Sequence, residues 1–225
     1  MPKFDAENTN TNSVVLNGTV SGCRIDGDHA SVYVGVMYID TDMPGDSNLA
    51  NRTKFRTHLV RVGLSDENRG FFENLARQSV YGPIRKMVPC EVNGRLRSDS
   101  DGNSYVECPS GGFKEAATVR YNKNNVFTLD GRLVSRSSTP SVASFSIEVD
   151  GGTFNGIVPK AVCPRAYAAL TGNKITVDTN VRMSGSADSL NLSDNTRAIL
   201  LMPRNIKALT LAKKTDVAQT SGPTM

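Results

Sequence analysis

Two neighbouring stretches of the chain place chemically useful side chains at alternate positions. In the first stretch, Val32, Val34 and Val36 alternate with Tyr33 and Met37. Successive residues of a strand face opposite sides of a sheet, so valines in the core would leave Tyr33 and Met37 on the outer face. An exposed tyrosine ring can stack on an aromatic base, and it can equally be an ordinary surface residue of a strand.

The next alternating stretch supplies cations. Lys54, Arg56 and His58 share one side of a strand, and Phe55 lies on the other. Cations that neutralise phosphates, next to rings that stack on bases, are the combination by which proteins bind single-stranded nucleic acid. We therefore predict that the basic side of this strand adjoins Tyr33. Phe55 is a further candidate for stacking, although its position also fits the core.

Further basic candidates lie later in the chain. Arg95 and Arg97 alternate with Leu96 and extend the predicted phosphate contacts. The second half offers five more candidates, which are Arg132, Arg136, Lys160, Lys174 and Arg182. Its stretch 143–149 places serines and Glu148 on the polar side, with no aromatic residue. The second half therefore either contacts phosphates or serves as a dimerisation or protein-docking module.

The two halves of the chain also differ in charge. Residues 1–112 hold 12 basic and 14 acidic side chains, a net charge of −2, and residues 113–225 hold 14 and 8, a net charge of +6. These values sum to the formal charge of +4 for the whole chain. A weak positive bias is compatible with phosphate binding and also with an ordinary solvated surface.

Motifs typical of enzymes are absent from the sequence. It contains no GxxxxGK[ST], HExxH, GxSxG or GxGxxG, and its two histidines leave little for acid–base catalysis. Asp40, Asp42 and Asp46 have a spacing similar to the first half of a calcium-binding loop, but Pro44 occupies a ligand position and no Glu closes the loop. We expect a solvated acidic loop there, no catalytic activity, no bound metal and no cofactor.

Cysteine usage and hydropathy indicate the compartment. The four cysteines have no CxxC spacing, and the N-terminal residues lack the apolar core of a secretion signal. The longest apolar run, 198–202, is far short of the ~20 residues that cross a membrane. We therefore expect a cytoplasmic protein without membrane contact, whose reduced cysteines fill space in the core.

Strand signals dominate the chain and repeat once. The first half predicts strands at 14–20, 30–38, 54–62, 87–96 and 104–108, with a helix that begins near Ser65 and contains Phe71, Phe72 and Leu75. The second half predicts strands at 126–134, 143–149, 154–160, 174–183 and 196–202, with a helix at 164–170. The turn at 99–103 predicts a hairpin, and 184–195 is expected to be a polar loop.

The order of these elements predicts the fold class. A helix between the third and fourth of five strands is typical of the OB-fold, a small Greek-key barrel. Gly18 and Gly131 occupy the same place in the two first strands (131 − 18 = 113 positions apart), where a strand bends around a barrel corner. We predict an all-β chain with minor helix content and two tandem OB-fold barrels. The alternative is a β-sandwich, whose strands alternate in the same way.

The predicted domain limits follow from the same repeat. The first barrel spans 1–112 and the second 126–206; a linker at 113–125 joins them, and a flexible polar tail at 207–225 ends the chain.

Several short motifs resemble those of single-stranded DNA-binding proteins of the bacterial and phage type. Residues 15–20 (VLNGTV) and 129–133 (LDGRL) are similar to the opening strand of that family. Residues 88–97 (VPCEVNGRLR), followed by an Asp-Gly hairpin, are similar to its V-x-G-x-L strand. The resemblance covers 13–109 and, more loosely, 125–202, and two barrels make the chain similar to tandem variants of the family. The chain has no tryptophan, which family members often use to stack bases.

The resemblance implies a non-enzymatic protein that coats and protects single-stranded DNA during replication or recombination. We expect a phage origin, with the host cell cytoplasm as the site of action, and a cellular source stays open. RNA as a ligand, replication or recombination proteins as partners, and an oligomeric state are all compatible with the sequence. Two other functions stay open, which are a protein-interaction OB module of a replication or recombination complex and a viral structural β-protein.

Overall fold

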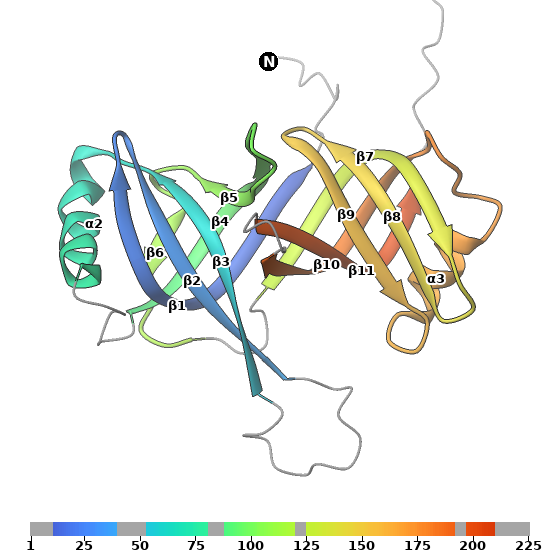
Figure 1. The fold of residues 1–225 in the computed structure, drawn as a ribbon, viewed down its shortest axis with the longest axis horizontal. Coiled ribbons are helices and arrows are strands. Elements are labelled where there is room, and N and C mark those ends of the chain that lie inside the picture. Colours follow the sequence, from blue (N-terminus) through green and yellow to red (C-terminus); the bar gives the residue numbers. More distant parts are fainter. Residues whose placement is uncertain (1–10, 40–52, 81–87, 120–124, 192–196, 210–225) are drawn as a thin grey trace, which may run out of the picture.

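The computed structural model describes residues 11–39, 53–80, 88–119, 125–191 and 197–209. These residues fold into two β-barrels that stand side by side, with helix α2 (Asp66–Ser79) and helix α3 (Pro164–Thr171) on opposite outer sides (Figure 1). The described strands form one continuous 11-stranded sheet that runs through both barrels.

The first barrel is closed by five strands. These are β1 (Asn12–Asp26), β2 (His29–Ile39), β3 (Thr53–Gly63), β4 (Val88–Ser98) and β5 (Ser104–Cys108). They pair in the order β1–β2–β3–β5–β4, and β4 pairs back with β1, so the ring is complete. β3 and β5 run parallel, and the other neighbours are antiparallel. A short strand, β6 (Phe113–Glu115), also pairs with β4.

The second barrel repeats this arrangement. Its strands are β7 (Asn125–Ser138), β8 (Val142–Val149), β9 (Gly152–Pro159), β10 (Asn180–Asn191) and β11 (Arg197–Ala208). They pair in the order β7–β8–β9–β11–β10, β10 closes onto β7, and β9 and β11 are the parallel pair. Both rings carry a helix between the third and fourth strands, which defines two tandem OB-folds. The predicted fold class is confirmed, and a β-sandwich is excluded because both rings close.

The two helices lie where the sequence predicts them. α2 buries Phe72 and Leu75 against the first barrel, and at its start the Ser65 backbone N–H donates to Asn68 Oδ1 (2.8 Å). α3 begins with Pro164, whose missing N–H is harmless in the first turn of a helix. Each helix therefore covers the interior of its own barrel from the outer side.

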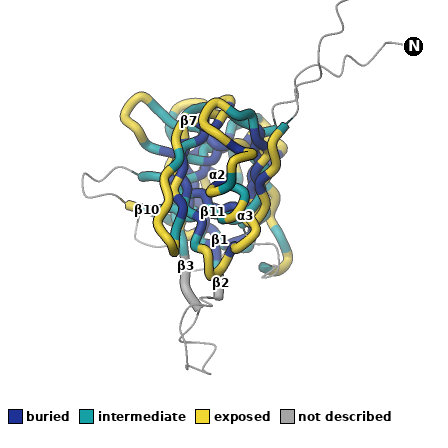
Figure 2. Tube along the Cα trace, turned by 90° about the vertical axis from the view of Figure 1, so that its right-hand side faces the viewer, coloured by how far each residue is buried: buried dark blue, intermediate teal, exposed yellow. Residues whose placement is uncertain are grey.

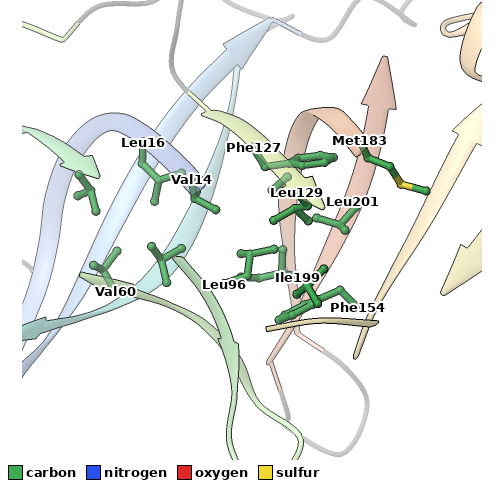
Figure 3. Packing of buried hydrophobic residues seen from close by; sticks show 14 of the residues in the cluster. Val14, Leu16, Val60, Leu96, Phe127, Leu129, Phe154, Met183, Ile199 and Leu201 are labelled. Atoms are coloured by element: carbon green, nitrogen blue, oxygen red, sulfur yellow. The ribbon is translucent and has the colours of Figure 1, made fainter. Parts of the chain in front are cut away.

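Each barrel encloses its own apolar interior. Figure 3 shows Val14, Leu16 and Val60 on the side of the first barrel, Phe127, Leu129, Phe154, Met183, Ile199 and Leu201 on the side of the second, and Leu96 of β4 beside Ile199. Each of these side chains is 3% exposed or less. The four cysteines are buried and free, as predicted. In Figure 2 the buried segments lie mainly in the middle of the molecule, and exposed segments surround them. Removal of this apolar surface from water is the main force that holds each barrel closed.

The two glycines of the first strands allow close strand approach. A Cβ at Gly18 would collide with the carbonyl oxygen of Gly35 in β2, and a Cβ at Gly131 would collide with that of Glu148 in β8. The same collision at the same place in both barrels confirms that the glycine pair marks equivalent corners.

Strand β10 corrects two predictions. A strand is expected at 174–183, but β10 begins only at Asn180, and residues 174–179 form bends and turns. The segment 184–195 is expected to be a loop, but residues 184–191 continue β10 and pair with β11 as far as Asn191 opposite Arg197. Polar side chains do not prevent a strand here, because pairing with β11 satisfies the backbone N–H and C=O groups of β10. This end of the hairpin also packs on β3 and β5 of the first barrel rather than on an apolar interior. Residues 192–196 lie outside the described residues.

A paired strand joins the barrels. Residues 12–16 of β1 pair with residues 125–129 of β7. The buried Asn12 reinforces the junction, since its Nδ2 donates to the backbone oxygens of Leu96 (3.0 Å) and Asp150 (2.6 Å). β6 lies within the predicted linker 113–125, and Ala208 ends β11 just inside the predicted tail. The domain limits themselves stay a prediction, and the rest of the tail (210–225) and the acidic loop at 40–46 lie outside the described residues.

Candidate nucleic-acid interface

The outer face of the first barrel carries two tyrosines and a leucine in one row across its strands. Tyr33 of β2 lies opposite Leu59 of β3. β3 and β5 run parallel, and Val60 pairs with Val106. The preceding residues of the two strands, Leu59 and Tyr105, therefore lie side by side. All three alternate with buried valines and are partly exposed. We call Tyr33, Leu59 and Tyr105 the outer row; it offers two rings on the strand face by which OB-folds bind oligonucleotides.

Each ring of the outer row has an arginine over it. The guanidinium carbon of Arg61, on β3, lies 4.0 Å from the ring centroid of Tyr105. The guanidinium carbon of Arg197 lies 4.8 Å from the ring centroid of Tyr33. Arg197 belongs to β11, so this second pair joins the two barrels. A guanidinium plane can itself stack on a base or bind a phosphate, so both pairs combine the two contacts that a nucleotide needs.

A chain of hydrogen bonds connects the two tyrosine–arginine pairs through the predicted hairpin at 99–103. The Arg197 backbone N–H donates to Asn103 Oδ1 (3.0 Å), and Asn103 Nδ2 donates to Asp99 Oδ1 (3.3 Å). Asp99 then accepts from the Arg61 guanidinium (3.1 Å). Burial raises the pKa of Asp99, but hydrogen bonds from Asn103 and Arg61 outweigh it and hold that pKa below its ordinary value. The hairpin therefore holds both arginines in position near neutral pH.

The structure corrects the predicted basic side of β3. His58 lies opposite Val34 and Arg56 lies opposite Val36, so both share the face of the core valines rather than that of Tyr33. Residues that oppose each other in an antiparallel pair lie on the same face, and a shift of one residue exchanges the faces. His58 is 0% exposed and cannot reach a nucleotide.

His58 instead belongs to the contact between the barrels. Its Nδ1 lies 2.7 Å from Ser189 Oγ in β10, and its Nε2 lies 3.3 Å from Asn125 Nδ2 in β7. Because an amide NH₂ only donates, Nε2 accepts, and Nδ1 of the neutral ring donates to Ser189. Asn125 also bonds the backbone oxygen and N–H of Ala187. Burial lowers the pKa of His58 to about 4, which keeps this ring neutral.

The remaining predicted residues of β2 and β3 have different placements. Arg56 Nε lies 2.7 Å from Asp188 Oδ1 of β10 and so forms an ion pair between the barrels. Met37 is half-buried on the side of Tyr33, opposite Phe55 in the strand register. The side chains of Lys54 and Phe55 lie outside the described residues, and their predicted roles stay predictions.

On β4, the two predicted arginines differ. Arg97 forms ion pairs with Glu107 (2.9 Å) and with Asp150 of the second barrel (3.3 Å), so its charge is shared by two carboxylates. Arg95 is exposed, and its guanidinium is open to solvent near the junction of the barrels. Of these two arginines, Arg97 lies nearer to the outer row, because it is opposite Tyr105 in the strand register, whereas Arg95 is opposite Glu107 and is more exposed.

The predicted cations of the second barrel are mostly engaged inside that barrel. Arg132 pairs with Glu148 and Asp178, and Arg182 pairs with Asp130, whose pKa it lowers by hydrogen bonding. Arg136 donates to the backbone oxygens of Leu170, Gly172 and Ile175 at the end of α3. The Lys160 ammonium lies 5.5 Å from the ring centroid of Tyr167, and Lys174 is exposed. The structure brings none of these five next to the outer row.

Four residues of the site were missed from the sequence, and Leu59 is one of them, because its side of β3 was expected to be the core side. Tyr105 and Arg61 had a usable signal, since both alternate with buried valines and so face outward. Arg197 had none, because it is 164 positions from Tyr33 (197 − 33 = 164) and reaches it only through the packing of the barrels.

The described residues give no support to a metal or membrane role. Within the described ranges no three His, Cys, Asp or Glu side chains converge as metal ligands do. Nor do those ranges contain a helix long and apolar enough to span a membrane.

The strand order defines two tandem OB-folds, and comparison with known proteins gives the same fold. No family model and no curated protein matches the sequence. The crystal structure of the wild-type single-stranded DNA binding protein from Thermus aquaticus is similar, with 16% identity and a TM-score of 0.62 over 91% of this chain and 96% of that chain. A deletion mutant of the Thermus aquaticus protein is similar too, with 14% identity and a TM-score of 0.59 over 92% of this chain and 98% of that one. At this identity the similarity shows the tandem fold.

Proposed function

We propose that this chain is a non-enzymatic protein that binds and coats single-stranded DNA. The observation that carries the proposal is the outer row, in which Tyr33 of β2 and Tyr105 of β5 each lie beneath an arginine on the outer face of the first OB barrel. The rings stack on unpaired bases and the guanidinium groups neutralise phosphates, which is the general means of sequence-independent single-strand binding. The fold shared with the Thermus aquaticus single-stranded DNA binding protein supports the proposal.

The proposal includes the finer role that the sequence motifs suggest. We place the protein in DNA replication or recombination in the cytoplasm of a host cell, with a phage as its source. Proteins of those processes are then its expected partners. RNA is a further candidate ligand, because stacking and phosphate contacts alone do not distinguish the two sugars.

The charges in the structure set the expected salt dependence. Arg61 and Arg197 lie over the rings, with Asp99 sharing the charge of Arg61, and Arg95 is exposed on β4, so we expect about three phosphate contacts at most. Each contact with a single strand contributes about −0.7 to the slope of log K against log salt, which gives a slope of about −2. This shallow slope would distinguish a site based on stacking from one based on many lysines.

The test is a titration of the purified chain with fluorescein-labelled dT oligomers at several salt concentrations. Duplex DNA of matching length and the matching rU oligomer serve as competitors. Binding that weakens with salt and that the duplex cannot displace is expected. If the chain fails to bind at low salt, the proposal is wrong; light scattering on the same sample then separates a small interaction module from a coat protein that assembles into large particles.

A further inference from the structure

The two barrels can be compared position by position, because they share one register. In the first barrel β1 and β2 pair Val20 with Val34 and then, after a bulge, Gly22 with Tyr33. In the second barrel β7 and β8 pair Leu133 with Ile147 and then, after a bulge at the same place, Ser135 with Ser146. Every position differs by 113 (146 − 33 = 113), so Ser146 is the equivalent of Tyr33.

The equivalents of the outer row have no ring. Ser146 lies opposite Asn155, as Tyr33 lies opposite Leu59, and Asn155 lies beside Leu200 of the parallel strand. Ser146 Oγ donates to Asn155 Oδ1 (2.7 Å), so these two polar side chains bond each other. The second barrel therefore offers Ser, Asn and Leu where the first offers Tyr, Leu and Tyr, and no base can stack on an aromatic ring there.

The hairpin of β10 and β11 extends from the second barrel onto the first. Three contacts fix it there: Asp188 with Arg56, Ser189 with His58, and the Arg197 backbone N–H with Asn103. In Figure 1 the ends of β10 and β11 lie between the barrels. The hairpin thereby holds the guanidinium of Arg197 over the Tyr33 ring, so a nucleotide that binds at this ring has the cation within reach of its phosphate.

We infer that the two barrels form one composite binding site rather than two equal modules. The first barrel provides the stacking rings, and the second provides Arg197 as a cationic wall at Tyr33. The ligand class is an unpaired nucleotide within a single strand, with its base on Tyr33 and its phosphate on Arg197. This inference rests on the proposed function and assigns different roles to the two barrels.

A double-mutant cycle on the full chain tests the inference. Affinity for a dT oligomer is measured for the wild type, Tyr33→Ala, Arg197→Ala and the double variant. Arg204→Ala is the matched control, because it removes the same charge from an exposed position of the same strand. Ser146→Ala tests the second barrel at the equivalent of Tyr33, and circular dichroism checks that each variant is folded.

In a composite site, the affinity lost by one substitution depends on whether the other residue is present. Tyr33→Ala is expected to weaken binding about 5- to 100-fold, the usual range for loss of one stacked base. Arg197→Ala is expected to weaken it about 5- to 10-fold and to make the salt slope shallower by about 0.7, the value for one phosphate. The double variant should lose clearly less than the product of the two factors, and Arg204→Ala and Ser146→Ala should stay within about twofold of the wild type.

Failure of the inference can be told apart from failure of the proposed function. A wild-type chain that does not bind any single strand overturns the function. A wild-type chain that binds, with Tyr33→Ala weakened but Arg197→Ala no weaker than Arg204→Ala, overturns the composite site alone. The composite site is also overturned if the affinity losses of Tyr33→Ala and Arg197→Ala are additive in the double variant. It is likewise overturned if Ser146→Ala weakens binding as much as Tyr33→Ala does.

Discussion

Acidification is expected to destabilise this protein through one buried histidine. His58 is fully buried and neutral, with a pKa lowered to about 4 by burial, against an ordinary value of about 6.5 in the unfolded chain. Between these two values the unfolded chain binds a proton that the folded chain does not. The stability that depends on the neutral ring is therefore almost complete at pH 7 and above, falls as the pH decreases through 6.5, and stops falling from this cause below pH 4.

The size of the effect follows from the two pKa values. The slope approaches 1.4 kcal/mol per pH unit between them, and integration from pH 7 to pH 5 gives a loss of about 2 kcal/mol. Carboxylates titrate mainly below pH 5, so this window isolates the histidine.

The assay is urea denaturation followed by circular dichroism at pH 7, 6 and 5. The chain has two histidines, so His29→Gln is the matched control and should keep the full pH dependence. His58→Gln can still accept and donate hydrogen bonds but does not titrate, so it should lose about 2 kcal/mol of that dependence. In the His29→Gln variant, NMR of the single remaining ring would report the pKa of His58 directly. A midpoint near 6.5 in the folded protein, or an unchanged pH dependence in His58→Gln, would refute the reasoning.

Three further predictions concern affinity and packing. Tyr105→Ala should weaken binding of a dT oligomer by about 1–3 kcal/mol in a fluorescence titration, and an unchanged affinity would remove it from the site. Arg136→Ala should cost about 1–3 kcal/mol of stability in urea denaturation, because it leaves the carbonyl oxygens at the end of α3 without their donor, whereas its dT affinity should not change. Gly131→Ala should destabilise the second barrel by about 1–3 kcal/mol, because the new Cβ collides with the Glu148 carbonyl oxygen. Thermal denaturation measures this loss, and a melting temperature equal to that of the wild type would show that β8 can move aside.

The sequence predicts the elements of this fold well because both barrels rely on simple alternation. Valines at every second position identified β2, and the helix between third and fourth strands identified the OB order. The exception was β10, which begins at Asn180 rather than at 174 and continues through 184–191, a segment that is mostly polar and has only Ala187 and Leu190 as larger apolar side chains. Its strand conformation comes from pairing with β11 and from contact with the first barrel, and neither leaves a periodic signal.

The site was harder to predict than the fold for two physical reasons. First, the faces of β3 depend on its register with β2, and one residue of shift moved Arg56 and His58 from the expected groove to the side of the core. Second, a side chain such as Arg197 acquires its place only when the two barrels pack together. Tyr33 was placed on the outer side because the adjacent valines determine its direction without reference to any other strand.

The position of β1 has a consequence for how the chain folds. This strand pairs with β2 and β4 of its own barrel and with β7 of the next, and Val14 lies opposite Phe127, 113 positions later (127 − 14 = 113). Until β7 is synthesised, one edge of β1 presents unsatisfied backbone groups to solvent, which is the usual route to pairing with the wrong chain. Contacts this distant in sequence also slow folding. If β1 leaves the first barrel, β7 of the second barrel loses its pairing with residues 12–16. The two barrels are therefore expected to unfold together in a single cooperative thermal transition.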